Sequence, residues 1–250
     1  MSTLKVDTIT DEAGTGAPTL SQGLNVNGGT IKLDGNYPVG TSNVALGDVA
    51  LSSVASDGSY NVAIGTSSLT DNTTGDNNVG LGRRALYSNT TASSNIAIGT
   101  QSLNTNTTGA SNVAVGHQSL LLNTTASNNT AVGYQAGYST TTDGENTALG
   151  SQALYSNTTG NRNVALGREA LYSSTTADGN TAVGFEAALN STTPELNAAV
   201  GFQALRTNTT GATNTAIGAS ALYSNTTASN NTAVGYQAGY AVTTGTHNTF

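Results

Sequence analysis

Residues 95–111 read NIAIGTQSLNTNTTGAS, and residues 112–128 repeat the same pattern as NVAVGHQSLLLNTTASN. Both stretches begin with a five-residue core, Asn-x-Ala-(Ile/Leu/Val)-Gly, which occurs twelve times along the chain, with Gly80 in place of Ala once. The cores begin at Asn43, Asn61, Asn78, Asn95, Asn112, Asn129, Asn146, Asn163, Asn180, Asn197, Asn214 and Asn231, and a thirteenth opens at Asn248. Every interval is 17 residues except the first, which is 18. A short fixed period predicts one structural unit stacked on itself many times.

Numbering each repeat from its core asparagine shows which positions are restricted. Position 4 is always Leu, Ile or Val, and position 5 is always Gly. Position 9 is Leu in nine copies, with Gly137, Ala188 and Gly239 as exceptions, and positions 13 and 14 are Thr-Thr from the second copy onward. Glycine in every core and the absence of a 3.6-residue apolar period argue against helix. The invariant glycine is expected at a corner where a positive φ or a close backbone approach is needed.

The core alternates between two kinds of side chain, as a β-strand does. Positions 2 and 4 are bulky and face one way, whereas positions 3 and 5 are Ala and Gly and face the other. A hairpin meander is possible from the period alone, but identical 17-residue copies favour parallel stacking of equivalent strands in one register. The sequence therefore predicts an all-β fold, a parallel β-solenoid over residues 43–250. At about 4.8 Å per coil, it would extend for about 55–60 Å.

We expect the bulky face to fill the coil interior together with the position-9 leucines. The predicted coil core is Ile64, Leu69, Leu81, Leu86, Ile98, Leu103, Val115, Leu120, Leu149, Leu154, Leu166 and Leu171. A coil this thin buries little apolar surface alone, and its small-residue face would let another backbone approach closely. We therefore expect that face to pack between chains of a homo-oligomer. The predicted inter-chain residues are Ala63, Ala97, Ala114, Ala131, Ala148, Ala165, Ala182, Ala199, Ala216 and Ala233. The core asparagines are expected to stack into a ladder of side-chain amides.

Composition narrows the possible functions. Of the 250 residues, 30 are Gly, none is Cys or Trp, and only 8% are charged, with a net charge of −7. Disulfides and thiolate metal sites are therefore excluded, and a nucleic-acid partner is not expected. No segment has the apolar length needed to span a bilayer, and the opening residues MSTLKVD lack the apolar stretch of a signal peptide.

The phrases NVAIG at 61–65, NIAIG at 95–99 and NTAIG at 214–218 resemble the head repeats of trimeric autotransporter adhesins, over roughly residues 43–250. That resemblance implies a YadA-like β-roll and a homotrimer wound around a common axis. Repeats of this style are also similar to those of bacteriophage tail fibres, and the opening phrase MSTLKVDTI resembles a fibre start that docks to the virion. Two features of the adhesins, a secretion signal and a membrane-anchoring barrel, have no counterpart in the sequence.

The resemblance implies a phage tail-fibre shaft assembled in the host cytoplasm and located in the virion. Residues 1–42 depart from the repeat and are expected to attach to another virion protein, a tail, nozzle or adaptor component, through Leu4, Val6 and Ile9. A simpler reading makes them a flexible leader and a cap on the first coil, and Asn27-Gly28-Gly29 could form a hairpin turn. Because the chain stops inside a repeat, a tip that binds a host surface receptor is expected beyond Phe250.

The residues that could carry enzymatic chemistry do not form a recognised constellation. His117 lies at the variable position 6 and is expected to face solvent, while Asp143 and Glu145 have no matching acids in neighbouring coils. Nucleophile-elbow, phosphate-loop and calcium-roll motifs are missing. We therefore expect no catalytic residue, no bound metal, no cofactor and no enzymatic activity.

Two residue columns leave other functions open. Tyrosine recurs at position 10, at Tyr87, Tyr138, Tyr155, Tyr172, Tyr223 and Tyr240, where it could bind glycan or cover the edge of a coil or the seam between chains. The first of these roles would suit a trimeric bacterial adhesin head that binds matrix or glycan. The Thr-Thr column suggests an ice-binding solenoid, although adjacent residues of a strand face opposite ways, so only one threonine of each pair could line a face.

Overall fold

The structure, a computed structural model, describes residues 42–250 except Ser56. The expected hairpin around Asn27 and the expected virion-attachment residues Leu4, Val6 and Ile9 lie outside the described residues. Within them the secondary structure is entirely β, with twelve strands of three residues each. These are β1 (Val44–Leu46), β2 (Val62–Ile64), β3 (Val79–Leu81), β4 (Ile96–Ile98), β5 (Val113–Val115), β6 (Thr130–Val132), β7 (Thr147–Leu149), β8 (Val164–Leu166), β9 (Thr181–Val183), β10 (Ala198–Val200), β11 (Thr215–Ile217) and β12 (Thr232–Val234).

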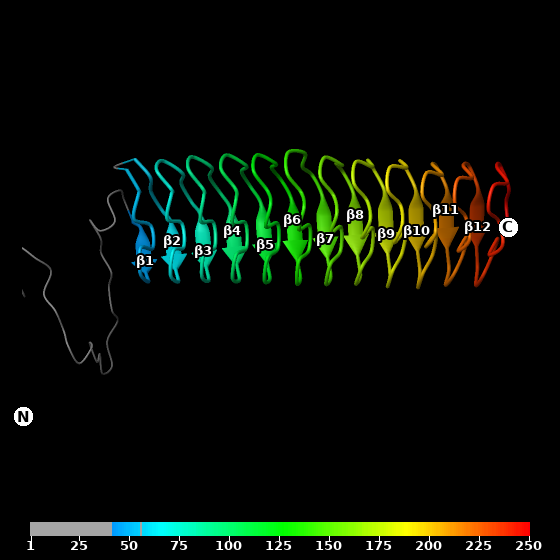
Figure 1. Ribbon diagram of the computed structural model, residues 1–250, viewed down its shortest axis with the longest axis horizontal. Coiled ribbons are helices and arrows are strands. Elements are labelled where there is room, and N and C mark those ends of the chain that lie inside the picture. The colour runs from blue at the N-terminus through cyan, green and yellow to red at the C-terminus, as the bar shows by residue number, and fades with distance from the viewer. Residues whose placement is uncertain (1–41, 56) are drawn as a thin grey trace, which may run out of the picture. The chain divides into compact units, whose positions relative to one another are not determined.

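The strands form one parallel sheet in sequence order, so each coil lies directly on the next (Figure 1). Equivalent core positions pair throughout; Ala114 of β5, for example, faces Ala97 of β4 and Ala131 of β6. The predicted all-β, parallel β-solenoid of 17-residue coils is confirmed. The first interval keeps this register although it is one residue longer, because Val44 still pairs with Val62. Its extra residue is accommodated between Ala55 and Gly58.

Backbone hydrogen bonds join the coils outside the strands as well. In the coil that begins at Asn112, backbone amides along the whole coil donate to carbonyl groups of the two neighbouring coils. Examples are Val113 N to Asn129 O (2.8 Å), Gly116 N to Ile98 O (2.7 Å), Leu120 N to Ala136 O (3.0 Å), Thr124 N to Thr141 O (3.1 Å) and Asn128 N to Ala110 O (3.1 Å). Each coil is therefore held to its neighbours all around its perimeter. Because buried backbone groups are costly when unpaired, the corners are as tightly specified as the strands.

Each strand stops after three residues because the backbone turns at position 5. The glycines there have φ between 128° and 139°, a region that is essentially restricted to glycine. Positions 7, 9 and 17 follow with positive φ as well, and the nine position-9 leucines have φ from 48° to 53°. Leucine in the left-handed region is strained by about 1–2 kcal/mol, so the stacking of coils must hold it there.

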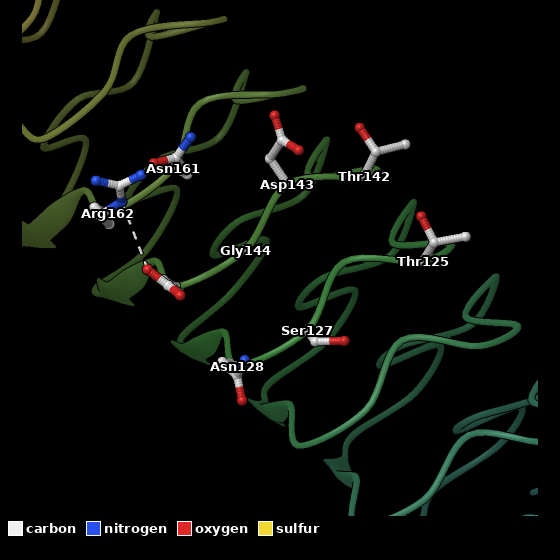
Figure 2. Close-up of a pocket in the computed structure, with 9 residues that line it drawn as sticks. Thr125, Ser127, Asn128, Thr142, Asp143, Gly144, Asn161 and Arg162 are labelled. Atoms are coloured by element: carbon white, nitrogen blue, oxygen red, sulfur yellow. Dashed lines mark ion pairs between the residues drawn. The ribbon is translucent and has the colours of Figure 1, made fainter.

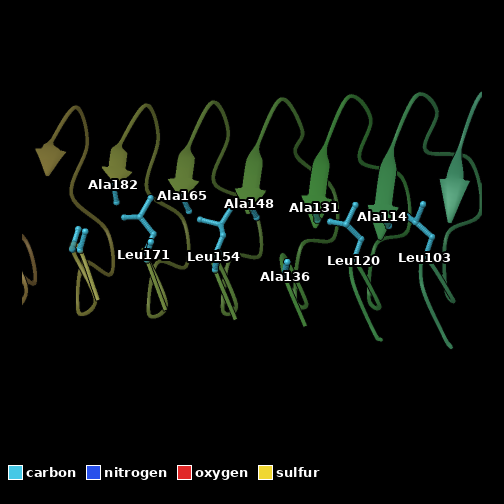
Figure 3. Packing of buried hydrophobic residues seen from close by; sticks show 14 of the residues in the cluster. Leu103, Ala114, Leu120, Ala131, Ala136, Ala148, Leu154, Ala165, Leu171 and Ala182 are labelled. Carbon is cyan, nitrogen blue, oxygen red and sulfur yellow. The ribbon is translucent and has the colours of Figure 1, made fainter. Parts of the chain in front are cut away.

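The interior contains the small face of the strand and the position-9 leucine (Figure 3). Leu103, Leu120, Leu154 and Leu171 point from one wall toward the strand alanines of the other, and they are completely or almost completely buried. Leu69 and Leu86 are equally buried. Position 8, which is Ala or Ser, is also buried in the coils from the second to the eleventh.

Two expectations about this interior are wrong. The strand alanines expected between chains are 0–2% exposed within the single chain, so they have no surface to offer a partner; they are Ala63, Ala97, Ala114, Ala131, Ala148, Ala165, Ala182, Ala199, Ala216 and Ala233. The position-4 residues expected in the core face outward instead. Ile64, Ile98 and Leu149 are exposed, and Leu81, Val115 and Leu166 are half-buried.

The reason for this inversion is the narrow space inside one coil. Because residue 9 is in the left-handed region, positions 8 and 9 both point inward, and the leucine reaches the opposite strand. A Cβ added at Gly80, which stands at position 3, would lie 3.4 Å from Leu69 Cδ1 and closer still to Ser68 Oγ. Position 3 can therefore hold a methyl group but not a branched chain, and the larger strand residues are left outside.

The core asparagines form a continuous hydrogen-bonded ladder, as the sequence predicts. The Oδ1 of each accepts the backbone amide of the next core asparagine; Asn112 Oδ1, for example, accepts from Asn129 N at 2.9 Å. The side-chain amide also donates across the coil, as in Asn112 Nδ2 to Ala126 O at 2.8 Å. These side chains are buried, so each satisfies backbone groups that no water reaches.

Candidate functional surfaces

The outer face of the sheet carries a continuous uncharged stripe, which is aliphatic at position 4 and a mixture of aliphatic residues and threonine at position 2. We call the position-2 and position-4 side chains of β1–β12 the strand stripe; position 4 alone contributes Leu46, Ile64, Leu81, Ile98, Val115, Val132, Leu149, Leu166, Val183, Val200, Ile217 and Val234. All of these are half-buried or exposed, with Leu149 at 49% and Ile217 at 42%. No residue of the stripe is charged. An apolar patch that follows the whole sheet is the kind of surface that marks a protein–protein interface.

Aromatic residues at positions 6 and 10 stack along the coils. Tyr138, Tyr155 and Tyr172 form a run with ring centroids 5.0 and 5.1 Å apart and planes within 16° of parallel. Tyr223 stacks on Tyr240 at 5.1 Å, and Phe185 on Phe202 at 5.4 Å. The ring separation is close to the coil spacing, so each aromatic ladder is a direct result of the repeat.

Stacking determines what these aromatic ladders can bind. A sugar ring binds to an aromatic ring through the flat face, but the faces of Tyr155 are covered by Tyr138 and Tyr172. At Tyr155 only the ring edge and the hydroxyl group are left uncovered by neighbouring rings. The geometry therefore favours the covering of a coil edge or a chain seam over a glycan platform. The same stack raises the pKa of Tyr155, first because burial disfavours the phenolate and then because neighbouring phenolates would repel it.

A charged network lies on the same side of the coils as the aromatic ladders. Arg206 donates from Nε to Glu186 Oε2 at 2.6 Å and from NH1 to the hydroxyl of Tyr223 at 3.4 Å, while Gln203 donates to Glu186 at 2.9 Å. Burial alone would raise the pKa of Glu186, but the two hydrogen bonds and the charges of Arg206 and Arg168 outweigh it and lower that pKa. The bond to Glu186 likewise raises the pKa of Arg206. The network joins three coils and leaves no reactive group free.

The two threonines of each pair have different environments. The position-13 hydroxyl donates to the carbonyl of the equivalent threonine in the next coil, as from Thr107 Oγ1 to Thr124 O at 3.0 Å. The position-14 threonines, from Thr74 to Thr244, are all exposed. Of the two columns of the Thr-Thr pair, only the position-14 column is fully exposed from coil to coil, and it lies at a corner.

A shallow polar groove lies across three successive corners, in the loops between β5 and β6, β6 and β7, and β7 and β8 (Figure 2). It has a volume of about 340 Å³ and is lined by Thr125, Ser127, Asn128, Thr142, Asp143, Gly144, Glu145, Asn161 and Arg162. Asp143 stands at position 15, where the other regular coils have Gly, Ala or Pro. Glu145 pairs with Arg162 at 3.6 Å, and both side chains are more than 60% exposed. The result is a solvated ion pair beside an open polar groove, without a desolvated acid, base or nucleophile.

The other candidate groups also lie at the surface. His117 is exposed and stacks on Tyr134, with ring centroids 5.7 Å apart. Across the described part of the chain, no three His, Cys, Asp or Glu side chains are grouped to hold a metal ion. None of the described residues belongs to a helix that could cross a membrane.

Comparison of the chain with protein-family models, with curated proteins and with solved structures gives no match.

Sequence reasoning missed a second asparagine column, although its signal is visible in the repeat. Position 12 is Asn in seven copies: Asn72, Asn89, Asn106, Asn123, Asn157, Asn208 and Asn225. All seven side chains are completely buried. A polar residue that recurs at one position of a buried repeat predicts an internal hydrogen-bonded column.

Proposed function

We propose that this chain is the structural shaft of a bacteriophage tail fibre, built as a homotrimer. The observation that supports this proposal most is the unbroken stack of twelve parallel coils, with an uncharged stripe along the outer sheet face that is aliphatic at position 4 in every coil. In the proposal, residues 1–42 attach to another virion protein, and a distal region outside these residues carries the tip that binds the host receptor.

The strand stripe supports association with copies of the same chain. Its side chains repeat at the coil spacing, so a parallel copy presents a matching stripe in register along its entire length. Burial of apolar surface drives such association at roughly 25 cal/mol for each Å² removed from water. The stripe also avoids charge repulsion between chains that each carry a net charge of −7. The interface is thus assigned to the strand stripe, in place of the alanines.

The mechanical role follows from the way in which the coils are joined. Backbone bonds on every side of the coil and the buried asparagine ladder connect each layer to the next. Bending the stack would stretch several of these bonds at once, so the coils form a stiff spacer. The three-fold symmetry and the phage context are inferred from the resemblance of the repeats and of MSTLKVDTI.

A trimeric bacterial adhesin head is the second candidate, because its repeats resemble these equally well. The stacked tyrosines favour the shaft, since stacking covers both faces of Tyr155 and one face each of Tyr138 and Tyr172. Ice binding is the weaker candidate, because the described corners expose a single threonine column.

Sedimentation equilibrium of the 250-residue chain tests the assembly. We expect a trimer, and we expect Leu149→Glu with Ile217→Glu to dissociate it, because both side chains are exposed in the single chain and would bring charge into the interface. Thr176→Glu, on the exposed position-14 corner, is the matched control and should stay trimeric. A folded monomer of the unaltered chain would contradict the proposal.

Labelling with an antibody against the coils tests the location. Label along fibres of intact phage particles supports the shaft, whereas label on bacterial surfaces with none on particles supports the adhesin. Thermal hysteresis of the purified chain would instead support ice binding.

A further inference from the structure

The position-12 asparagines form an internal ladder where they follow one another without interruption. Asn106 Nδ2 donates to Asn89 Oδ1 at 2.9 Å and to Gly109 O, three residues ahead, at 2.9 Å. Asn89 makes the same pair of bonds, to Asn72 Oδ1 at 2.8 Å and to Ala92 O at 3.0 Å. Each side-chain amide therefore satisfies one side-chain oxygen and one backbone carbonyl inside the coil.

The ladder stops in two consecutive coils, where position 12 is serine. Ser174 and Ser191 replace asparagine between Asn157 and Asn208, and all four side chains are completely buried. Seven buried side-chain atoms of the described residues have no hydrogen-bond partner. Thr140 Oγ1 and Asn123 Oδ1 lie where threonine interrupts the ladder, and Ser174 Oγ, Ser191 Oγ and Asn157 Oδ1 lie at the two serines. A buried polar atom left without a partner is destabilising, so the three atoms at the serines require an explanation.

The carbonyl groups that face these serines are also short of a donor. Ala92 O, in the intact ladder, accepts from Asn78 Nδ2 at 2.8 Å and from Asn89 Nδ2 at 3.0 Å. Ala177 O accepts only from Asn163 Nδ2 at 2.7 Å, and Pro194 O only from Asn180 Nδ2 at 2.8 Å. Serine thus leaves an acceptor position open in each of the two coils.

The coils do not close up around the shorter side chains. Next to the serines, Thr158 N donates to Thr175 O at 2.8 Å and Thr175 N donates to Thr192 O at 2.9 Å. The corresponding bond in the intact stretch, from Thr107 N to Thr124 O, is 2.9 Å. Because the spacing is unchanged, the space of the missing amide group remains between the layers.

Serine at another buried position behaves differently. Ser102 Oγ and Ser119 Oγ, both at position 8, donate to Ala114 O and Ala131 O at 2.9 Å. Buried serine in this fold is therefore satisfied by protein atoms where a carbonyl lies within reach. At position 12 the hydroxyl is too short to replace the amide.

We propose that the coil interior binds two internal water molecules at Ser174 and Ser191, where they replace the amide groups of the ladder. The first water donates to Asn157 Oδ1 and Ala177 O and accepts from Ser174 Oγ. The second donates to Ser174 Oγ and Pro194 O and accepts from Ser191 Oγ. Each has three polar partners, which is the usual number for a buried water.

A crystal structure that resolves ordered solvent tests the sites directly. We expect one peak within hydrogen-bond distance of Ser174 Oγ, Asn157 Oδ1 and Ala177 O, and one near Ser191 Oγ and Pro194 O. Asn106→Ser, the matched variant, places serine in an intact stretch and should gain a water bound to Asn89 Oδ1 and Gly109 O. Empty density at both native sites, or in the variant, overturns the proposal.

Ser174→Ala supplies a test that does not depend on crystals. If the hydroxyl binds water, its loss should raise the hydrogen-exchange rate of the Thr175 amide by roughly threefold to tenfold, since a net hydrogen bond contributes about 0.5–1.5 kcal/mol. If the hydroxyl has no partner at all, removing it relieves a penalty, and exchange becomes slower or stays the same. An unchanged or slower exchange rate therefore overturns the proposal.

Discussion

Glycine at position 5 sets the closest approach between neighbouring coils. At Gly116 the φ is 137°, and an added Cβ would lie 2.7 Å from the carbonyl carbon of Gly133. Gly235 has nearly the same φ, 135°, but its added Cβ would meet nothing nearer than Ala238 Cβ at 3.9 Å. Substitution of Gly235 therefore tests backbone strain alone, whereas substitution of Gly116 tests the same strain together with a clash between coils.

We predict that Gly116→Ala is much more destabilising than Gly235→Ala in the 250-residue chain. Gly235→Ala should cost about 1–3 kcal/mol from backbone strain alone. Gly116→Ala adds the clash with Gly133 and should exceed about 4 kcal/mol, which is diagnostic of a severe steric defect. Chemical denaturation measures the unfolding free energy of both variants. Equal losses would show that the clash between coils adds nothing to the backbone strain.

The position-9 leucines combine a packing gain with a backbone penalty. We predict that Leu154→Ala costs about 2–5 kcal/mol through the cavity that it leaves. Leu154→Gly should cost no more than Leu154→Ala, because φ at Leu154 is 53° and glycine adopts this conformation without strain. At an ordinary strand position glycine would be the worse residue by about 0.5–1 kcal/mol. Gly137 and Gly239 occupy the same position, so a clearly less stable glycine variant would contradict this account.

The three-residue strand is too short to be stable alone and gains its order from the elements that continue around the coil. Beyond the strand, the aromatic and threonine columns at the corners also stack from coil to coil, at the same spacing as the strand side chains. In the tyrosine ladder, burial and the neighbouring phenol groups of Tyr138 and Tyr172 together raise the pKa of Tyr155.

We predict that the chain loses stability as the pH rises above about 10, the ordinary pKa of tyrosine. The pKa of Tyr155 is raised, so the folded chain keeps a proton that the unfolded chain loses, and the unfolding free energy falls with increasing pH there. Tyr138→Phe with Tyr172→Phe keeps the stacked rings but removes the neighbouring phenolates. The pKa of Tyr155 should then move back toward its ordinary value, as a pH titration of the tyrosinate absorbance would show. An unchanged titration would mean that the stacked phenolates of Tyr138 and Tyr172 do not contribute to the raised pKa.

Over the whole molecule, stability is a property of neighbouring layers. Each coil contacts the coils before and after it through the same atoms, so one complete coil can be removed without changing any remaining type of contact.

We predict that deletion of residues 112–128 leaves a folded chain that is shorter by one layer, about 4.8 Å. The deletion joins Ser111 to Asn129, which restores the order of positions 17 and 1. Deletion of residues 112–127 removes one residue fewer and should be strongly destabilising at the junction, because the added residue has no place in the asparagine ladder. Circular dichroism and thermal melting distinguish the two.

The sequence alone determined the architecture because the period, the invariant Gly and the alternating core each limit the backbone. A repeat with Asn at position 1 and Gly at position 5 in every copy can satisfy its buried groups by stacking in register, and the structure has this arrangement. The asparagine ladder followed from the same column. Residues 1–42 and the resemblance to phage fibres remain predictions about partners.

Which face of the strand is buried was decided only by the tertiary structure. Alternation separates Ala114 from Val113 and Val115 but cannot say which side is inside, and the larger residues were placed there wrongly. The left-handed leucines turn a second side chain inward and fill the coil, so only a methyl group fits opposite. Interior volume depends on contacts between residues that are distant within the coil, and a local pattern does not contain that information.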